Sequence, residues 1–399
     1  MTELIDRPRL PQAPLTDEQA DWVARVERVT PLLMQTRDIA ERDRRMPDEV
    51  FEALRELGFT RMWISKAFGG GQVGITTGMA VLEELARVDA SVAWQIGVQG
   101  AIGRLSDYLP VQSSYELFAG SSGFVVGGVK PSGRAEPVAG GYLLKGDWAM
   151  ASGSAHADWL LCTALVTHGG VPVVTETGPD IAMLFVPASK AVIRDTWYTV
   201  GLRGTGSNHY SVDELFVPDE LGVRKSQMGG TPPQRPERGY PVSYFDFGPM
   251  STAPVALGIA AEALEAFKEM AAGKVPASGT VALADSGVVQ DRLGRAEMMV
   301  HSSRVVLHDA ARMLESGGGS GDESVSALIR LASATLAENA MAAVDTAYTL
   351  AGSTSLYATS RLERCFRDVH SVTKHLALSH SHYETVGQYL LGGHLQVRK

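Results

Sequence analysis

Cysteine is scarce in this chain, which has two, Cys162 and Cys365, among 399 residues. Neither belongs to a CxxC pair or to the spacing of a metal site, so the sequence predicts no metal centre. Isolated thiols are typical of a reducing compartment, and we expect a cytoplasmic location. Basic blocks are missing too, since 36 Lys and Arg face 45 Asp and Glu, for a net charge of -9. Nucleic acid is therefore not an expected partner.

Long apolar runs are also absent. No stretch approaches the roughly 20 apolar residues that a membrane-spanning helix needs. The first residues, Met1 to Arg7, lack the apolar core of a signal peptide. Hydrophobic residues make up 45% of the chain and charged residues 20%, a balance typical of soluble globular enzymes. We therefore expect a soluble protein without a membrane partner, large enough for two or three subdomains.

The periodicity of the apolar residues changes twice along the chain. It is helical to about residue 110, shifts to short runs punctuated by Gly, Pro and Asp, and becomes helical again from Met250. This order predicts an α+β fold. We expect an N-terminal helical domain (1–118), a small central antiparallel β-barrel (119–230) with an exit linker at Gly229 to Pro236, and a C-terminal four-helix bundle (231–399). The bundle helices are expected at 253–271, 287–314, 323–351 and 362–391.

Motifs spread over most of the chain carry a family resemblance. Gly146 to Trp159 (GDWAMASGSAHADW) is similar to a flavin-facing strand, and Gly201 to Ser207 (GLRGTGS) to the chain that leaves the barrel. A C-terminal signature is matched by Leu350-Ala351-Gly352, Leu362-Glu363-Arg364 and Arg367-Asp368. Together these motifs resemble the acyl-CoA dehydrogenases. The resemblance implies their fold, with a small barrel between two helical layers, and a flavin site.

The chain departs from the dehydrogenases at their catalytic base. Most of them place a glutamate nine residues after the arginine of the Arg-Asp pair, where this chain has Leu376. A minority place it at a position that corresponds to about Gly248, where Asp246 is the nearby acid. Their Arg-x-x-Phe-Gly segment, which helps to hold the adenine half of FAD, has no match from Lys268 to Gln290. Without its base, a dehydrogenase should not abstract a proton beside a thioester carbonyl at a useful rate.

One branch of the superfamily, the two-component flavin-dependent monooxygenases, fits better. The chain resembles it at Ala151-Ser152-Gly153, at His156 to Trp159, and at Arg367-Asp368 followed by His375. The resemblance implies an oxygenase component that receives reduced flavin from a separate flavin reductase. In this component the reduced flavin would react with O2 and form a C4a-hydroperoxyflavin. That intermediate would hydroxylate or N-oxygenate a small organic substrate. The expected cofactor is FMN, with FAD as the alternative, and the implied assembly is a homotetramer.

The resemblance also assigns residues. His375 is expected to face the substrate and to deprotonate or orient it, because an imidazole suits a phenol or an amine. Ser152 is expected beside flavin N5. The further candidates are Ser154, Trp148, Arg203 and Ser207 for the cofactor, and Gln99, Phe245 and Phe247 for the substrate pocket.

Several assignments have structural alternatives. His375 would otherwise be a surface or capping histidine, and Trp148 a core residue of the barrel. Arg203 would otherwise stabilise a turn, and the two phenylalanines would pack at a helix end.

Two other functions remain open. One is an acyl-CoA dehydrogenase or oxidase with an unusual base such as Asp246, and the other is a flavin-binding or assembly protein without chemistry. The substrate is open among phenols, polyketide aromatics, amino sugars, sulfur heterocycles and primary amines. Many enzymes of the branch carry a second histidine in the helix from Trp94 to Leu105, where this chain has Gln95 and Gln99. A simple phenol is therefore less expected.

Overall fold

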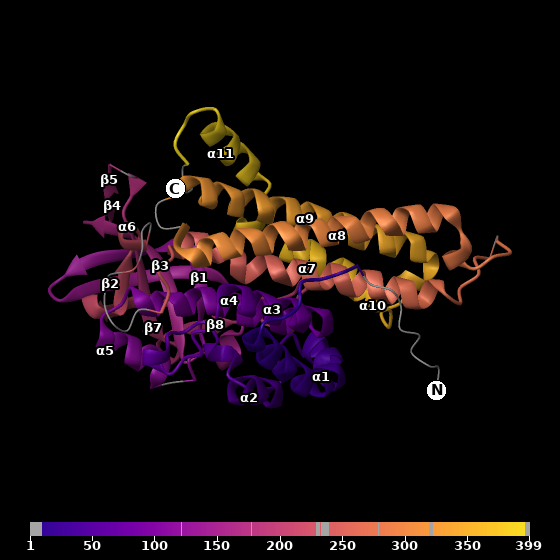
Figure 1. Ribbon diagram of the computed structural model, residues 1–399. Coiled ribbons are helices and arrows are strands. Elements are labelled where there is room, and N and C mark those ends of the chain that lie inside the picture. Colours follow the sequence, from indigo (N-terminus) through magenta and orange to yellow (C-terminus); the bar gives the residue numbers. More distant parts are fainter. Residues whose placement is uncertain are drawn as a thin grey trace.

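The elements follow one another in the order that the periodicity predicts, helices, strands and then long helices. The computed structural model describes residues 10–120, 122–176, 178–228, 232, 239–277, 279–318 and 322–395. Figure 1 shows the N-terminal helices below, the strands to the left and the long C-terminal helices above. The expected linker, Gly229 to Pro236, lies outside the described residues except at Pro232. The domain bounds stay predictions; the described strands all lie within 125–224.

The N-terminal part packs around one deeply buried helix. α1 (Asp17–Asp43) begins at a capping box formed by Thr16 and Gln19. α4 (Ala90–Gly103) is buried on nearly all sides, as expected for a helix that is apolar all round. It is capped by the Asp89 carboxylate and contacts α3, α7 and Arg203–Thr205, which lies in the loop between β8 and β9. The other helices of this part are α2 (Asp48–Glu56), α3 (Ile75–Val88) and α5 (Val111–Ser114).

The central sheet has the strand order β10-β7-β3-β1-β2-β9-β8, with β4 paired to β3. The expectation of an antiparallel barrel was wrong for one pair, because β1 and β3 run parallel. Apolar runs mark the strands but do not say which partner each strand takes. Arg224 of β10 donates to the Tyr142 hydroxyl of β2 at 2.9 Å, a contact between two strands that are not neighbours in the sheet. The strands are β1 (Val125–Val138), β2 (Gly141–Ala151), β3 (Trp159–His168), β4 (Val171–Pro172), β7 (Ile181–Pro187), β8 (Val192–Arg194), β9 (Asn208–Pro218) and β10 (Gly222–Arg224), with β5 (Val174–Thr175) and β6 (Gly178–Pro179) as a separate pair.

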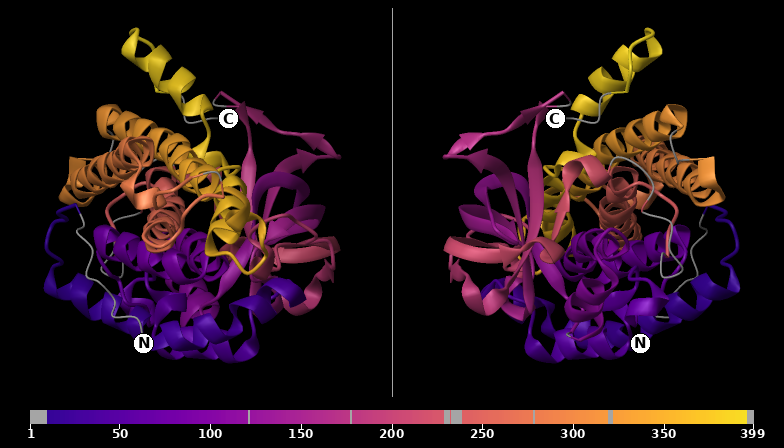
Figure 2. Two further views of the ribbon diagram at one scale, coloured as in Figure 1. Left: turned by 90° about the vertical axis from the view of Figure 1, so that its right-hand side faces the viewer. Right: turned by 90° about the vertical axis from the view of Figure 1, so that its left-hand side faces the viewer.

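The C-terminal helices form a bundle that packs on the N-terminal helices, and Figure 2 shows α11 projecting from it. Glu323–Leu356 is by length and composition apolar enough to cross a membrane, but 61% of its most apolar part is buried within the protein. This burial is expected for a central helix, since α9 packs on both α7 and α8. The helices are α6 (Lys225–Met228), α7 (Tyr244–Ala271), α8 (Gly287–Met313), α9 (Glu323–Ala351), α10 (Arg361–Val372) and α11 (Ser381–Leu390).

The first bundle helix is longer than expected. α7 begins at Tyr244 rather than near 253, because the Ser243 hydroxyl accepts the Asp246 N–H and caps the helix there. Pro249 and Pro254 lie within α7.

The last expected helix, 362–391, is interrupted at His375. Its backbone is extended there (φ -71°, ψ 142°), and the His375 ring accepts the Ala377 N–H at 3.3 Å. A side chain that bonds the backbone locally competes with the helix. The single-helix prediction was therefore wrong, and the histidine lies in the connection between α10 and α11.

Candidate active site

β2 ends in a tight turn that contains Ser152. Met150 and Gly153 both lie in the left-handed region, with φ of 66° and 80°. A Cβ on Gly153 would come within 2.9 Å of Gln95 Oε1 and closer still to a neighbouring ring, so glycine is required here. The turn leaves Ser152 6% exposed and brings its hydroxyl to 2.7 Å from that of Ser207.

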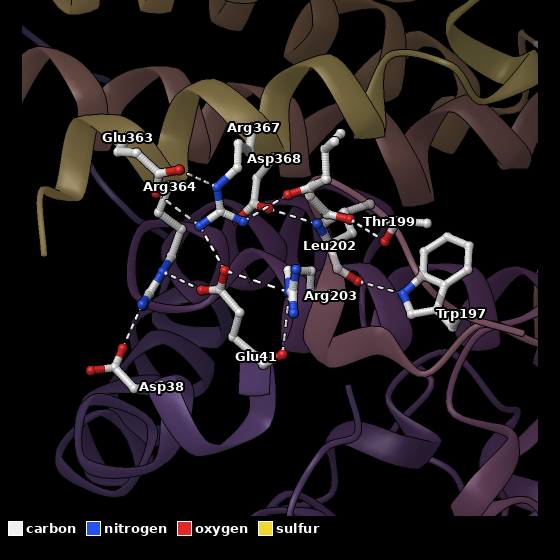
Figure 3. Close-up of polar contacts among 12 residues, drawn as sticks. Asp38, Glu41, Trp197, Thr199, Leu202, Arg203, Glu363, Arg364, Arg367 and Asp368 are labelled. Carbon is white, nitrogen blue, oxygen red and sulfur yellow. Dashed lines mark hydrogen bonds and ion pairs between the residues drawn. The ribbon is translucent and has the colours of Figure 1, made fainter. Parts of the chain in front are cut away.

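A row of hydroxyls leads from Ser152 toward α10. Ser207 Oγ lies 2.6 Å from Thr205 Oγ1, and Thr205 donates to the Leu202 carbonyl at 2.9 Å. The Leu202 N–H in turn donates to the Asp368 carboxylate at 2.7 Å, as drawn in Figure 3. We call Ser152, Ser207 and Thr205 the hydroxyl row. All three are buried.

Charged residues surround the far end of this row. Burial raises the pKa of Asp368 to about 7, although the Leu202 N–H and Arg367 lower it. Figure 3 shows Arg367 reaching both the loop between β8 and β9 and Glu41 of α1; the Arg367–Glu41 distance is 2.6 Å. Arg203 lies in the same network, with its Nε 3.8 Å from the Glu41 carboxylate and donating to the Glu41 carbonyl at 3.3 Å. This placement agrees with the turn-stabilising alternative for Arg203 rather than with a phosphate contact.

His375 lies half-buried against the Trp94 ring, with the ring centroids 5.2 Å apart and edge to face. Desolvation by the surrounding protein lowers its pKa to about 4. Its Nδ1 accepts the Ala377 N–H, so in the neutral ring the proton is on Nε2. Within the described residues, Nε2 has no hydrogen-bond partner. His375 is therefore a neutral donor near pH 7, which supports the orienting role and not deprotonation.

Helix α4 links His375 to the turn that contains Ser152. Trp94 contacts His375, and the next residue, Gln95, donates to the Ser91 and Gly204 carbonyls at 3.1 and 3.3 Å. The Gln95 Oε1 lies beside Gly153, next to Ser152, and no described group satisfies this buried acceptor. Ser152 and His375 thus flank one segment of α4.

Two other predicted residues lie close to this segment. Ser154, 2% exposed, donates to the Gly206 carbonyl at 3.4 Å, beside the hydroxyl row. Gln99, one turn along α4 from Gln95, donates a hydrogen bond to the Gly123 carbonyl at 2.8 Å. Its side chain is buried.

The three aromatic candidates differ in how deeply their rings are buried. Trp148 is a core residue, 2% exposed, stacked on Tyr210 and donating to the Thr163 carbonyl at 2.7 Å. Phe247 is fully buried against Trp63. Only Phe245, half-buried at the start of α7, keeps an accessible face. Both rings are enclosed by the protein core, which favours the core alternative for Trp148; the assignments of Trp148 to the cofactor and of Phe247 to the pocket stay predictions.

No carboxylate base stands at either position that the dehydrogenases use. Leu376 occupies one and is 63% exposed. Gly248 occupies the other, and a Cβ there would meet nothing within 4 Å. Asp246 is buried, accepts from the Ser243 hydroxyl at 2.7 Å and pairs with Arg330 at 3.1 Å. Its carboxylate is a structural partner and not a free base.

The residues around Ser152 fit the polar edge of a flavin ring. They offer hydroxyl groups and the unsatisfied Gln95 acceptor, and a buried polar atom without a partner is unusual unless a ligand supplies one. A cavity of about 440 Å³ near Arg224 lies elsewhere, and one of about 170 Å³ near Arg361 reaches Asp368 at the far end of the network. Neither is lined by Ser152 or His375.

Sequence reasoning missed Thr205, Trp94 and Gln95. Thr205 stands between two glycines in the loop between β8 and β9, and only the folded loop shows that its hydroxyl turns inward. Gln95 was noted only as a non-histidine. Its buried, unpaired oxygen is a property of the packing.

The fold and this site define a flavoenzyme with an acyl-CoA dehydrogenase architecture, in which Leu376 occupies the position of the carboxylate base and His375 precedes it. The family model "Acyl-CoA dehydrogenase, N-terminal domain" matches residues 16–108, and "Acyl-CoA dehydrogenase, C-terminal domain" matches residues 250–380. An indole-3-acetate monooxygenase of Pseudomonas putida is 30% identical over 88% of this chain and 89% of its own length.

Two further relatives cover nearly the whole chain. The oxygenase component of an FADH(2)-dependent resorcinol hydroxylase from Rhizobium sp. is 29% identical over 97% of this chain and 98% of its own. XiaF from Streptomyces sp., solved with FADH2 and glycerol, superimposes with a TM-score of 0.88 over 96% of this chain and 97% of its own, at 24% identity. The chain belongs to the acyl-CoA dehydrogenase family, in its branch of flavin-dependent monooxygenases.

Proposed function

We propose that this protein is the oxygenase component of a two-component system that hydroxylates or N-oxygenates a small aromatic substrate with reduced flavin and O2. The observation that carries the proposal is the neutral His375 beside Trp94, on the α4 segment that also touches the Ser152 turn. The relatives named for indole-3-acetate and resorcinol act on aromatic rings. That shared feature narrows the substrate classes that the sequence leaves open.

Each residue of the proposed site has its own role. Reduced flavin, when bound at the Ser152 turn, supplies the two electrons with which one atom of O2 enters the substrate and the other becomes water. Ser152 and Gln95 would hold the polar edge of the ring. The His375 Nε2–H would donate to an acceptor on the substrate and orient it, and the Trp94 ring would limit the positions of His375. The Trp94 ring would also cover one side of His375 and limit the access of water there.

We further propose that a separate flavin reductase supplies the flavin, in the cytoplasm, where free cysteines such as Cys162 stay reduced. FMN is the preferred form because the Arg-x-x-Phe-Gly segment has no match between Lys268 and Gln290. FAD is the alternative cofactor, because FADH2 stands in the names of two similar proteins. Assays with both forms decide.

A homotetramer is also proposed. Met298, Val305, Val306 and Met313 of α8 are 41–55% exposed and follow one another at helical spacing. Such an apolar stripe suits packing against another helix. A second copy of the chain would cover it.

The test is turnover with the purified protein, a flavin reductase, NADH and either FMN or FAD. Indole-3-acetate and resorcinol serve as probes, and oxygenated product is expected only when flavin is reduced and O2 is present. Dye reduction with a panel of acyl-CoA thioesters should give no turnover. Turnover with a thioester would support the dehydrogenase alternative and contradict the proposal.

A further inference from the structure

Gly248 leaves an open space beside helix α7. It lies inside the helix, and its backbone is not left-handed. A Cβ at this position would meet nothing within 4 Å. Glycine is less favourable than alanine in the interior of a helix, because it loses more backbone freedom on folding. Neither the backbone conformation nor close packing therefore requires a glycine here.

The proline that follows does not require the glycine either. A proline crowds the Cβ of the residue before it when that residue is helical. Within the same helix, however, Pro254 follows Ala253, and the Ala253 side chain is accommodated in the core. Helix α7 thus accepts a side chain before a proline, and the glycine before Pro249 must have another cause.

Gly248 lies on a face of α7 that neither α4 nor α9 covers. Successive residues of a helix are turned by about 100°. The backbone of α7 at Ser251 packs on α4, since a Cβ on Gly97 would collide with the Ser251 carbonyl oxygen. The Asp246 carboxylate faces α9. Gly248 and Phe245 lie on the face between these two contacts, and both are partly exposed.

Helix α4 presents an apolar face beside this part of α7. Three of its residues, spaced as i, i+4 and i+7, share that face: Trp94, Val98 and Ala101. The face lies between Gly97, which packs on α7, and Gln95, which lies beside the turn that contains Ser152. It therefore opens between α7 and the end of β2.

The two faces lie on one side of the α4–α7 pair. Helix α3 contacts both helices and covers the opposite side, where a Cβ on Gly97 would lie 3.3 Å from Leu82 of α3. The short helical turn Leu376–Leu378, which follows His375 directly, contacts α7. We call five residues the α4–α7 wall: Trp94, Val98, Ala101, Phe245 and Gly248. Since Trp94 contacts the His375 ring, the histidine stands at the Trp94 end of this wall.

We propose that Gly248 is a specificity-determining residue, whose missing side chain leaves room for the second ring of a fused two-ring aromatic substrate. The proposal rests on the proposed function, in which the His375 Nε2–H holds a polar group of the substrate. With that group at the Trp94 end, the rings extend along the wall toward Gly248 and Phe245. The five wall residues carry no charge, which suits an aromatic surface. A side chain at position 248 would fill the space that the second ring needs.

The experiment compares a two-ring probe with a one-ring probe. The kcat/KM values for indole-3-acetate and resorcinol are measured with a flavin reductase, NADH and FMN, for the full-length wild type, Gly248→Ala and Gly248→Val. The ratio of the indole-3-acetate value to the resorcinol value should fall about tenfold in Gly248→Ala, the scale of one carbon in an apolar pocket, and further in Gly248→Val. The KM for indole-3-acetate should rise more than its kcat falls, because binding is lost before the transition state.

Stability distinguishes this role from a structural one. Gly248→Ala should unfold at the temperature of the wild type or above it, because alanine favours a helix and its Cβ meets nothing here. Gly387 of α11 gives a matched control, since it is also helical and partly exposed, with open space at its Cβ. Gly387→Ala should likewise keep its unfolding temperature, and it should not change the ratio. If Gly248→Val fails to fold, Gly248→Ala decides.

A ratio within about twofold of wild type in both Gly248 variants would overturn the proposal, since one carbon is worth more in a filled pocket. A lowered unfolding temperature of Gly248→Ala would overturn it too, because the helix itself would then need the glycine. So would wild-type turnover of resorcinol without indole-3-acetate. If the wild type oxygenates only indole-3-acetate, the fall in that kcat/KM, compared with Gly387→Ala, replaces the ratio. Turnover of neither probe would contradict the proposed function instead.

Discussion

At the scale of single residues, the tautomer of His375 decides what the site can do. Nδ1 is occupied by the Ala377 N–H, and desolvation lowers the pKa to about 4. The ring stays neutral above pH 5 or so and presents Nε2–H. Such a group donates to a substrate oxygen or ring nitrogen but takes no proton from it.

This predicts an asymmetry between two substitutions. His375→Gln keeps an N–H donor and should retain kcat within roughly tenfold of wild type. His375→Leu removes the donor and should lose roughly 100-fold or more. Steady-state turnover with indole-3-acetate or resorcinol, measured as product, is the readout. Equal losses in both variants would show that basicity and not donation is required.

The pH dependence gives an independent check. Because the pKa of His375 is lowered to about 4 by burial alone, its ionisation should not shape kcat/KM between pH 5.5 and 8.5. Any break in that range should persist unchanged in His375→Gln. A wild-type break near pH 6.5 that is absent in His375→Gln would mean that the histidine titrates at its ordinary value.

The sequence could nominate Ser152, Ser207 and His375, because a family resemblance attaches to fixed positions in a motif. It could not show which groups they bond. The inward turn of Thr205, the left-handed backbone at Leu202 and the unpaired Gln95 oxygen are properties of the folded loop and its packing. The contacts of this loop with α4 and α10, Gln95 with Gly204 and Leu202 with Asp368, join residues 109 and 166 positions apart, beyond the reach of local patterns.

At the scale of elements, α10 and the loop between β8 and β9 are coupled through Asp368 and Leu202. The carboxylate is buried, and desolvation raises its pKa to about 7 from an ordinary value of 3.8. Arg367 opposes this rise, while the nearby Asp89 and Glu41 add to it. The folded state binds the proton more tightly than the unfolded state, so stability should fall as pH rises from about 4 to about 7.

Asp368→Asn tests the coupling. The amide oxygen can still accept the Leu202 N–H, but it carries no charge. The wild type should lose about 2–3 kcal/mol of unfolding free energy between pH 5 and pH 8 that the variant does not lose. Urea unfolding at the two pH values, at one protein concentration, measures this. Parallel losses in both proteins would show that Asp368 keeps its charge at both pH values in the folded protein.

Periodicity located most elements, because burial of one helix face or one strand face repeats along the chain. Periodicity gave the wrong helix bounds where a single side chain caps the helix. Ser243 starts α7 early, and the His375 ring ends the helical path after α10. Both events depend on a single side chain that bonds the backbone, which an average over a helical window does not register.

At the scale of the whole molecule, the site lies where three layers meet. α4 comes from the N-terminal helices, Ser152 from the turn after β2, and His375 from the connection between α10 and α11. The order of these layers was predictable from composition and periodicity. The parallel pairing of β1 with β3 was not, because strand partners are chosen by the assembled core.

Assembly gives a further prediction. The double variant Met298→Glu with Val305→Glu places charges on the exposed apolar stripe of α8 and should reduce the mass measured by light scattering to that of a smaller assembly. Val174→Glu, at a position of similar apolar exposure on the distant β5, should leave it unchanged. An unaltered mass for the double variant would place the interface elsewhere.

We expect this chain to control the reaction of reduced flavin with O2. The test is rapid mixing of the protein, loaded anaerobically with reduced FMN, against oxygenated buffer, with absorbance followed in time. Reoxidation is expected in two spectrally distinct phases, the second much slower than for free reduced FMN and faster in Ser152→Ala. A single phase at the rate of free FMN, with stoichiometric H2O2, would contradict it.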